Sequence, residues 1–339
     1  MKSVTPELPT VLLINPHSRR GHQVFHEYRE ELGQRLNLVD AALTQSPDDM
    51  AERIRHGLDR HVVRFIVGGG DGTLSQAADI LADTEGILGV LPLGTGNTFS
   101  HGLGLPQSPR ELAKLLTEGP ISRYDVGVAV KGNQRKVFLN SLTMGFSEQL
   151  VELLSRESKD RLGYLAWIVE FRRALHRTPT MDVRLSWPHG GDAFLTRQLV
   201  VVNGRTIAAG IAATPASSGQ DGLLEVFRLG GPSFLSMLRL GTKLLTGRLL
   251  TDREAHYTAV TEISIETHPA LPVNIDGEIW LESPISCRVN PGALWVIAPS
   301  SQGQSPHRWP LVTRTLGGPR PLMPRIRHYS ARKGTTGSS

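Results

Sequence analysis

Two glycine-rich segments, each placed directly after an apolar run, constrain the fold of this chain more than any other feature. The first segment reads GGGDGT at 68–73 and follows Val62–Val67, and the second reads LPLGTGNT at 91–98 and follows Ile87–Leu91. Apart from Arg64 the first run is wholly apolar, which is typical of a strand covered on both faces in a parallel sheet. Glycine allows tight turns and a close approach of backbone amides to a ligand. The pattern therefore predicts buried strands that end in ligand-binding loops.

The first 125 residues alternate between strand-like and helix-like segments. The strand-like segments are Val11–Asn15, Leu38–Leu43, Val62–Val67 and Ile87–Leu91, and the helix-like segments are Gln23–Leu36, a helix that starts at Ser46, Thr73–Ala82 and a helix that starts at Ser108. Ser-Pro pairs at 46–47 and 108–109 supply a hydroxyl cap and a proline in the first helical turn. This alternation predicts a doubly wound parallel sheet with helices on both faces.

Short β-rich segments replace the alternating pattern near Tyr124. The expected strands are Val126–Val130, Val137–Leu142, Met181–Trp187, Arg197–Asn203, Leu224–Leu229, Glu262–Glu266, Ile285–Val289 and Leu294–Ile297, interrupted by helices at Arg161–His176 and Ser233–Leu245. Strands at this spacing predict an antiparallel sandwich or barrel. Because 339 residues exceed the usual size of one hydrophobic core, we expect domains at 8–125 and 126–300. We also expect a basic segment at 301–339, part of which returns to the first domain and whose end is disordered.

The basic charge of the chain is concentrated at its C-terminal end. Lys and Arg number 37 against 32 Asp and Glu, and the eight basic and no acidic residues after Glu282 leave a net charge of −3 for residues 1–282 (+5 − 8). A basic tail suits an anionic membrane surface or nucleic acid. The single cysteine, Cys287, excludes an intramolecular disulfide, and no apolar run approaches the roughly 18 residues of a membrane span. Val11–Asn15 is also too short for the apolar core of a signal peptide.

The glycine segments have the residue types that bind phosphate. Backbone amides and the start of a helix favour an anion, and Thr73 adds a hydroxyl group. Asp71 is the only charged residue in the first segment and suits a magnesium ion or a structural cap. The alternative, a tight turn with Asp71 as its cap, does not require three consecutive glycines. A third segment, NPHSRRG at 15–21, leaves the same expected edge of the sheet, where ligands of doubly wound folds bind.

Together these segments resemble the diacylglycerol kinase catalytic-domain family, which includes bacterial lipid kinases, sphingosine kinases and ceramide kinases. The resemblance rests on Asn15-Pro16, the two glycine segments, FLN at 138–140 with MGF at 144–146, TPA at 214–216 with DGLLEV at 221–226, and DGE at 276–278. NAD kinases and phosphofructokinases share a GGDG loop but lack this later arrangement. The resemblance covers about residues 9–300. It implies an α/β nucleotide domain of the NAD kinase and phosphofructokinase type, joined to a β-sandwich, with the active site between them.

The resemblance also implies roles for individual residues. ATP would be bound by Asn15, Pro16, Ser18, Thr44, Gly69, Gly70, Asp71, Gly72, Thr73, Ser75, Gly94, Thr95 and Asn97. Glu278 would be the general base, with Asp71 as a second catalytic residue. Mg²⁺ would be bound by Asp221 and by backbone oxygens of Ser218 and Leu223. Taken without the family, the run Asn274–Glu278 fits a type I′ hairpin and Asp221-Gly222 a simple turn.

The sequence departs from the family pattern at two places. Thr98 stands where many members have an aspartate, although sphingosine-kinase-like members also lack it. That departure puts a plain diacylglycerol acceptor in doubt. Arg19 and Arg20 stand where Ser-Gly is common, which alters the expected nucleotide contacts.

A lipid acceptor requires contact with a membrane surface. The segment Phe234–Leu250 is apolar and carries Arg239 and Lys243, and a second apolar segment contains Trp167. Basic amphipathic helices suit the membrane interface, and either segment is a candidate border of the lipid entrance. The alternative, that both helices pack on the sandwich, is favoured for most of these side chains.

We therefore expect an ATP- and Mg²⁺-dependent lipid kinase, cytoplasmic and peripheral on the inner membrane face. The expected partners are the lipid and an anionic membrane surface, with no nucleic acid and with a homodimer left open. Diacylglycerol, a sphingoid base, a phospholipid head group and a prenol all remain candidate acceptors. Two alternatives stay open: a soluble nucleotide or sugar kinase of the NAD kinase type, and a nucleotide-binding regulator whose basic tail binds nucleic acid. NAD phosphorylation would select the first, and salt-dependent DNA binding without ATP turnover the second.

Overall fold

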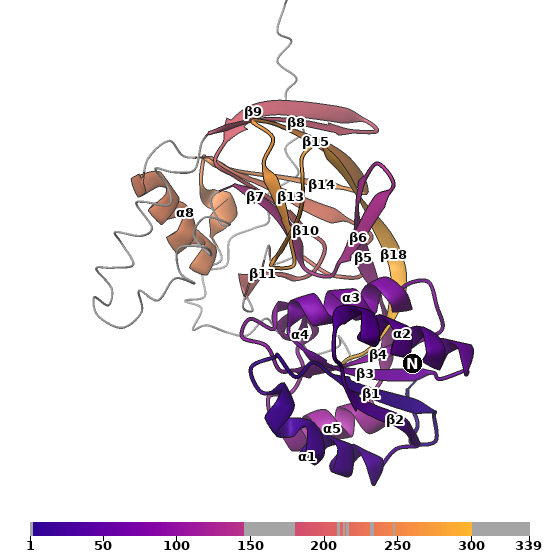
Figure 1. The fold of residues 1–339 in the computed structure, drawn as a ribbon. Coiled ribbons are helices and arrows are strands. Elements are labelled where there is room, and N and C mark those ends of the chain that lie inside the picture. Colours follow the sequence, from indigo (N-terminus) through magenta and orange to yellow (C-terminus); the bar gives the residue numbers. More distant parts are fainter. Residues whose placement is uncertain are drawn as a thin grey trace, which may run out of the picture. The chain divides into compact units, whose positions relative to one another are not determined.

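The computed structural model describes residues 3–145, 180–208, 211–212, 214, 217–230, 234–246 and 248–299. An α/β part and a β-sandwich follow one another along the chain (Figure 1). This arrangement confirms the predicted fold class. The expected helix Arg161–His176 and the segment 301–339 lie outside the described residues.

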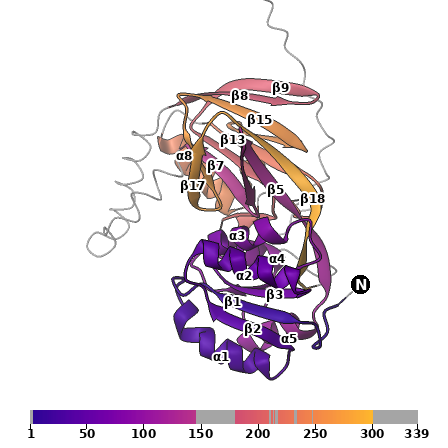
Figure 2. The ribbon, with the colours of Figure 1, turned by 45° about the vertical axis from the view of Figure 1, so that its right-hand side comes forward.

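The α/β part is built on four parallel strands in the order β2-β1-β3-β4. The strands are β1 (Thr10–Ile14), β2 (Leu38–Leu43), β3 (Arg64–Gly69) and β4 (Ile87–Pro92), and the helices between and after them are α1 (Gly21–Gly33), α2 (Pro47–Asp59), α3 (Asp71–Leu81), α4 (Thr98–Leu103) and α5 (Pro109–Glu118). Figures 1 and 2 show α1 and α5 on one face of the sheet and α2 and α3 on the other. Every residue of β1 and β3 is buried, as the apolar runs predict.

Strands β1 and β3 are neighbours, but the helices that follow them cover opposite faces of the sheet. The order of the strands reverses at this point, so the loops after β1 and β3 diverge from one edge. Doubly wound sheets bind their ligands where the order reverses in this way, outside the carboxyl ends of the strands. The topology alone therefore places a candidate site at the loops that follow Ile14 and Gly69.

Arg64, the one charged residue in the apolar run, is completely buried in β3. Its guanidinium group donates hydrogen bonds to the backbone oxygens of Leu116 (2.8 Å) and Thr5. Leu116 is in the last turn of α5, where helix carbonyls lack intrahelical partners. Burial lowers the pKa of Arg64 to about 10. The arginine therefore joins α5 to the amino-terminal edge of the sheet and plays no part at the opposite edge.

The sandwich consists of two antiparallel layers around a common apolar core. One layer contains β5 (Ile121–Lys131), β6 (Gln134–Phe138), β8 (Met181–Trp187), β9 (Gly190–Thr196), β15 (Glu262–His268) and β18 (Ile285–Ile297). The other has the order β14-β13-β10-β7-β16-β17, with β7 (Ser141–Gly145), β10 (Gln198–Val202), β13 (Leu224–Leu229), β14 (Ala255–Val260), β16 (Pro272–Ile275) and β17 (Glu278–Glu282). Figure 2 labels β7, β13 and β17 of this second layer, in which β10 lies between β13 and β7, and β16 between β7 and β17.

Strand β18 corrects the expectation of two separate strands at Ile285–Val289 and Leu294–Ile297. It is one strand that pairs with β15 in the sandwich and with β4 in the parallel sheet, so ten strands form one continuous sheet. An irregularity between Asn290 and Leu294 separates its two ends. Gly292 has φ +56° there, a conformation that favours glycine. A local bend of this kind looks like two strands in a sequence.

Other differences concern element boundaries. The expected strand Val137–Leu142 is divided between β6 and β7, because the chain turns from one layer to the other at Leu139 and Asn140. Strands β9 and β14 were not expected, and the second expected helix is present as α8 (Phe234–Leu245), followed by a short 3₁₀ helix at Leu249–Thr251. No helix within the described ranges is both long and apolar enough to cross a membrane.

Candidate active site

Helix α3 begins inside the first glycine segment. Gly70 is its N-cap residue, and among the described residues no side chain caps this end of the helix. The carboxylate of Asp71 accepts hydrogen bonds from α4 instead. A side chain at Gly69 would collide with Thr73, since its Cβ would lie 2.5 Å from the Cβ of the threonine. The amides at this end of α3 are therefore available to an anion, and such helix ends favour phosphate.

The second glycine segment is closed by its asparagine. Asn97 accepts a hydrogen bond from the backbone amide of Gly94 and donates one to its carbonyl oxygen, both at 2.9 Å. The two glycine segments also pack against each other, because a Cβ on Gly94 would lie 2.6 Å from the Cα of Gly70. Only glycine permits this approach. Thr95, which follows Gly94 in the loop, is exposed.

Asp71 fixes the two glycine segments to one another. Its carboxylate accepts hydrogen bonds from the backbone amides of Thr98 and Phe99, both at 2.9 Å, at the start of α4. It also accepts one from the side chain of Asn140 at 3.1 Å. Asp71 thus supplies the cap that Asn97, in a left-handed conformation, does not supply. The sequence suggested Asp71 as a cap of the turn before α3. Asp71 does act as a cap, but for α4.

The loop after β1 joins the same group. Asn15 donates a hydrogen bond from its side chain to the Thr73 hydroxyl at 3.0 Å, across the point where the strand order reverses. Ser18 donates to the backbone oxygen of Asn15 at 2.7 Å. Thr44 is buried directly after β2, on the other side of β1. Pro16 is half-buried in the first of these loops.

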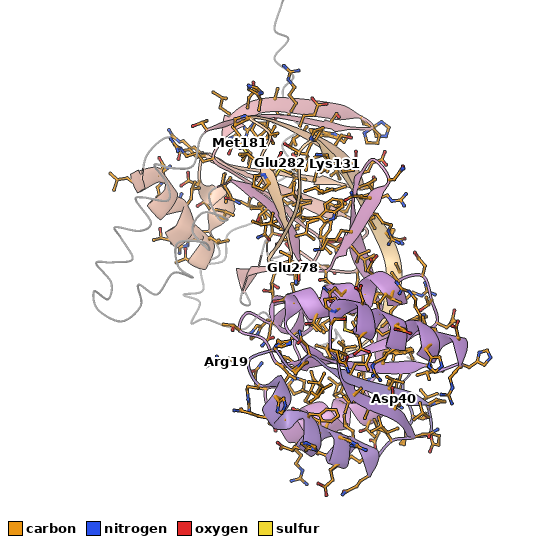
Figure 3. All side chains as sticks on the ribbon, in the orientation of Figure 1. Arg19, Asp40, Lys131, Met181, Glu278 and Glu282 are labelled. Atoms are coloured by element: carbon orange, nitrogen blue, oxygen red, sulfur yellow. The ribbon has the colours of Figure 1, made fainter. Side chains whose placement is uncertain are left out.

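Glu278 lies at the first position after the turn of the β16–β17 hairpin. Asp276 and Gly277 both have positive φ, +49° and +94°, which confirms the type I′ turn. This turn brings the Oε1 atom of Glu278 to 2.7 Å from the position that a Cβ on Gly72 would occupy. The other oxygen, Oε2, accepts a hydrogen bond from Lys136 Nζ at 2.8 Å. Figure 3 shows Glu278 beside α3. The hairpin therefore places a carboxylate next to the glycine segment.

Asp276 holds this hairpin against both α3 and the chain between β6 and β7. Its carboxylate accepts hydrogen bonds from the Ser75 hydroxyl and from the backbone amides of Leu139, Asn140 and Ser141. Burial raises the pKa of Asp276, although the four hydrogen bonds oppose this effect. Ser75 was predicted as a nucleotide ligand, and its hydroxyl group is engaged with Asp276. Asp276 was missed as an individual site residue, because a turn aspartate shows no distant partners in a sequence.

Asn140 was missed for the same reason. It is buried, its backbone amide binds Asp276, and its side chain binds Asp71. It therefore connects the carboxylate that orders the glycine segments to the carboxylate that holds the Glu278 hairpin. The only sequence signal was its place in FLN at 138–140.

The predicted magnesium ligands form a separate group. The Asp221 carboxylate accepts a hydrogen bond from the Leu223 amide at 3.0 Å. The Asp125 carboxylate accepts hydrogen bonds from the backbone amides of Gly222 and Gly292, both at 2.7 Å, and so ties this loop to β18. Partial desolvation, followed by the nearby charge of Asp125, raises the pKa of Asp221.

The negative charge of Asp125 beside the Asp221 carboxylate is one that a hard cation bound by Asp221 would offset. Asp221 together with backbone oxygens fits the oxygen preference of Mg²⁺. Within the described ranges, however, no cluster of three His, Cys, Asp or Glu side chains is present. Ser218 and Leu223 would thus have to contribute backbone oxygens, as the sequence led us to expect.

Glu225 is a further buried carboxylate near this loop. It accepts hydrogen bonds from the hydroxyl groups of Ser217, Thr214 (3.3 Å) and Tyr257 (3.0 Å). Burial raises its pKa against the effect of these bonds. Glu225 thereby anchors both ends of the segment 214–217 to β13.

The basic side chains of α8 are engaged within the protein. Arg239 makes two hydrogen bonds to the Asp252 carboxylate, at 2.8 and 3.0 Å, and Lys243 lies 2.9 Å from the same group. These contacts fix α8 to the segment that leads into β14. Among the side chains described in this region, Leu235 and Leu250 are apolar and exposed, at 72% and 44%. Trp167 lies outside the described residues.

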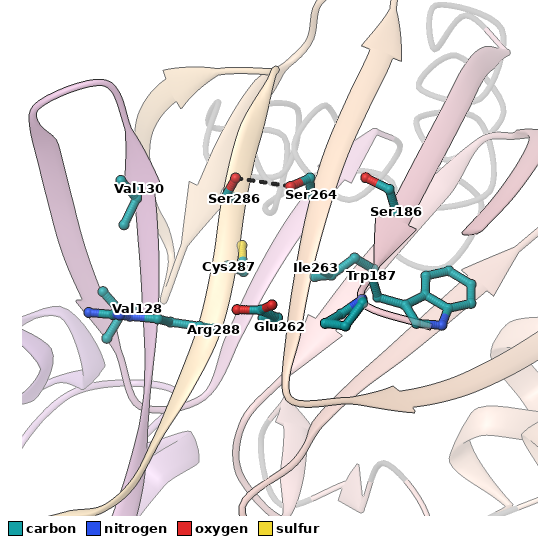
Figure 4. Close-up of a pocket in the computed structure, with 11 residues that line it drawn as sticks. Val128, Val130, Ser186, Trp187, Glu262, Ile263, Ser264, Ser286, Cys287 and Arg288 are labelled. Carbon is teal, nitrogen blue, oxygen red and sulfur yellow. Dashed lines mark hydrogen bonds between the residues drawn. The ribbon is translucent and has the colours of Figure 1, made fainter. Parts of the chain in front are cut away.

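One depression on the outer face of the sandwich has a volume of about 310 Å³. Figure 4 shows it running across β5, β18, β15 and β8, with Ser286 and Ser264 hydrogen-bonded at 3.1 Å and with Glu262, Arg288 and Trp187 along its walls. None of its lining residues belongs to the glycine segments or to the Glu278 hairpin. The depression is therefore distinct from the candidate active site.

Comparison with known proteins agrees with these observations. Residues 9–129 match the diacylglycerol kinase catalytic domain, and residues 141–298 match the YegS C-terminal NAD kinase beta sandwich-like domain. Two relatives, one from Chromohalobacter salexigens and one from Pseudomonas aeruginosa UCBPP-PA14, carry the name "Probable lipid kinase YegS-like". They are 29% and 33% identical to this chain, over 78% and 76% of its length and 86% and 84% of theirs.

Solved structures share the fold. The crystal structure of a diacylglycerol kinase from Bacillus anthracis str. Sterne aligns with a TM-score of 0.65 at 22% identity, over 89% of this chain and 99% of that one. Another chain from the same organism aligns with a TM-score of 0.70 at 24% identity and the same coverage. Taken together, the two matched domains and the relatives show that the chain belongs to the diacylglycerol kinase catalytic-domain family, among the YegS-like lipid kinases.

Proposed function

We propose that this protein transfers the γ-phosphoryl group of ATP to a lipid hydroxyl group at a membrane surface. The observation that carries the proposal is the placement of the Glu278 carboxylate beside Gly72, where one half of the molecule offers a base and the other a phosphate-binding loop. Membership of the lipid kinase family supports a kinase.

Phosphoryl transfer depends mainly on position and charge, so each group has a definite task. The amides of the glycine segment hold the phosphates, with Asn15 and Thr73 at one side of them. The lipid oxygen attacks the γ-phosphorus as its bond to the bridging oxygen of ADP breaks. Glu278 takes the proton of the lipid hydroxyl group on Oε1, the oxygen that faces the loop.

Magnesium, when bound, would supply positive charge that orders the loop before β13. It would be held by Asp221 and the backbone oxygens of Ser218 and Leu223, in the loop whose Gly222 amide donates a hydrogen bond to Asp125. For membrane contact, the exposed Leu235 and Leu250 are better candidates than Arg239 and Lys243, whose charges are already paired.

The test is incorporation of label from γ-labelled ATP into a total lipid extract in the presence of Mg²⁺. Glu278→Gln should lower incorporation by at least about 1,000-fold. Glu282→Gln is the matched control, because Glu282 is exposed on the same strand and Lys131 bonds its backbone oxygen and not its carboxylate. Near-normal turnover in Glu278→Gln would remove this base. A wild-type protein that phosphorylates NAD but no lipid would select the nucleotide-kinase alternative.

A further inference from the structure

Lys136 is a basic side chain of the candidate active site to which the proposed function gives no role. It extends from β6 and donates a hydrogen bond from Nζ to Glu278 Oε2 at 2.8 Å. Oε1 of the same carboxylate faces Gly72. The ammonium group and the glycine segment are therefore both neighbours of one carboxylate, and a phosphate held by the segment would lie close to both.

The glycine segments supply no positive side chain of their own. Neither 68–73 nor 91–98 contains a lysine or an arginine, whereas P-loop enzymes place a lysine on the β- and γ-phosphates. Arg19 and Arg20 are exposed in the loop after β1. A cation at the reacting end of the triphosphate must therefore come from outside these segments, and Lys136 is beside Glu278, where that end would lie.

The fold holds Lys136 at this place. Strand β6 pairs with β5, and Arg135, the preceding residue, forms an ion pair with Asp79 of α3 at 3.0 Å. Helix α3 is the one that starts in the glycine segment, so β6 and the segment are fixed to a common element. The Lys136 side chain is only 22% exposed, and reduced contact with water strengthens its interaction with a negative group.

We propose that Lys136 is a catalytic residue that binds the γ-phosphoryl group during transfer, an inference that rests on the proposed kinase function. Its ammonium group bonds Glu278 Oε2. With ATP it also donates a hydrogen bond to a γ-phosphate oxygen, and it keeps its proton throughout. As the bond to ADP breaks, it balances the negative charge on the transferring group, while the proton of the acceptor hydroxyl group passes to Glu278 Oε1.

The experiment compares Lys136→Met and Lys136→Arg with Arg184→Met, which removes an exposed charge from β8 of the same sheet. Label transfer from saturating γ-labelled ATP to a total lipid extract should fall about 100-fold in Lys136→Met, with partial rescue in Lys136→Arg and little change in Arg184→Met. ATP affinity should fall about 10-fold in Lys136→Met, while ADP affinity changes less than about twofold, because ADP lacks the γ-phosphate.

The nucleotide arm separates this inference from the proposed function. The wild-type protein could label no lipid, while Lys136→Met loses the preference for ATP over ADP that the wild type shows. In that case the lipid assignment is wrong and the role of Lys136 stands. If the wild type labels lipid and Lys136→Met does so equally well, Lys136 is not catalytic. Equal losses of ATP and ADP affinity would also overturn the proposal, because they would indicate a general loss of structure rather than a lost γ-phosphate contact.

Discussion

Glu278 and Gly72 are so close that a methyl group on the glycine would come within 2.7 Å of the Glu278 Oε1 atom. Glu278 lies on a hairpin of the sandwich, and Gly72 lies at the start of α3 in the α/β part. This contact therefore joins the two parts of the molecule directly. Gly72 has no positive φ that would require glycine. Its lack of a side chain therefore serves the position of Glu278 and not the backbone.

Gly72→Ala should separate activity from stability. The new methyl group must displace the Glu278 carboxylate, and a shift of about 1 Å in a reacting group can lower turnover about 100-fold. Alanine in a helix also raises the free energy of unfolding, by up to about 1 kcal/mol. We expect a loss of phosphoryl transfer in a protein that is as stable as the wild type or more so, measured by label transfer and by urea unfolding.

The matched control for this variant is Gly33→Ala. Gly33 is also helical, and a Cβ there would meet only the Leu38 side chain, at an ordinary 3.9 Å. It should share any gain in stability and keep full activity. Full activity in Gly72→Ala would mean that Glu278 does not act from this position.

Asp71→Asn should destabilise the protein as well as lower its activity. The asparagine side chain has one oxygen and one NH₂ group, so it cannot accept all three hydrogen bonds from Thr98, Phe99 and Asn140. At least one of these N–H groups would then face the NH₂ group. Loss of such a cap lowers the free energy of unfolding by about 1–2 kcal/mol. Asp79→Asn, which removes only an exposed ion pair of the same helix, should cost less than about 1 kcal/mol. Equal unfolding curves for the two variants would contradict the capping role of Asp71.

Local patterns predicted the α/β part well because three of its four strands, β1, β3 and β4, are almost entirely buried. The apolar runs at β1, β3 and β4, and the Ser-Pro start of α2, each depend on neighbours in the sequence. Strand β18 depends on distant partners, since one end pairs with β15 and the other with β4. No local pattern tells a bent strand that joins two layers from two short strands.

The candidate site divides in the same way. Glycine segments and a DGE turn are visible in the sequence, and the resemblance identified Glu278 among them. Asp276, Asn140 and Lys136 were not visible as site residues, because their roles arise from contacts between segments more than 60 residues apart in the chain, such as Ser75 with Asp276 and Asn140 with Asp71. A lysine in a strand and an aspartate in a turn are each ordinary until those contacts are known.

Asp125→Asn tests whether the Asp221 loop holds magnesium. Asp125 receives the amides of Gly222 and Gly292, and an asparagine amide nitrogen would face one of these donors instead of accepting from it. The loop should loosen, so that half-maximal activity requires several-fold more Mg²⁺, while turnover at saturating Mg²⁺ recovers. Asp182→Asn, at an exposed position of β8, is the control. If the wild type, Asp125→Asn and Asp182→Asn gave identical magnesium titrations, this loop would not be the magnesium site.

The packing of α8 should depend on pH through Asp252. Hydrogen bonds from Arg239, with a further contribution from Lys243, hold the pKa of Asp252 well below its usual range. A carboxyl group whose pKa is lowered in the folded state adds stability above its unfolded pKa of about 3.9, and this contribution is lost as the pH falls toward the folded value. Asp252→Asn lacks the contribution at every pH. We therefore expect the wild-type protein to be the more stable at pH 7, and the difference to shrink as the pH falls from about 5 to about 2.5.

Urea unfolding of both proteins across this range measures that difference. Asp192→Asn is the control, because Asp192 pairs with Arg228 at a similar 3.0 Å but is 51% exposed, and an exposed pair adds little stability. Its difference from the wild type should stay small and nearly constant with pH. If Asp252→Asn behaved in the same way, the pairing of Arg239 and Lys243 with Asp252 would not hold α8. The two basic side chains would then be available to an anionic membrane surface, and charge reversal at both positions would be the test of membrane binding.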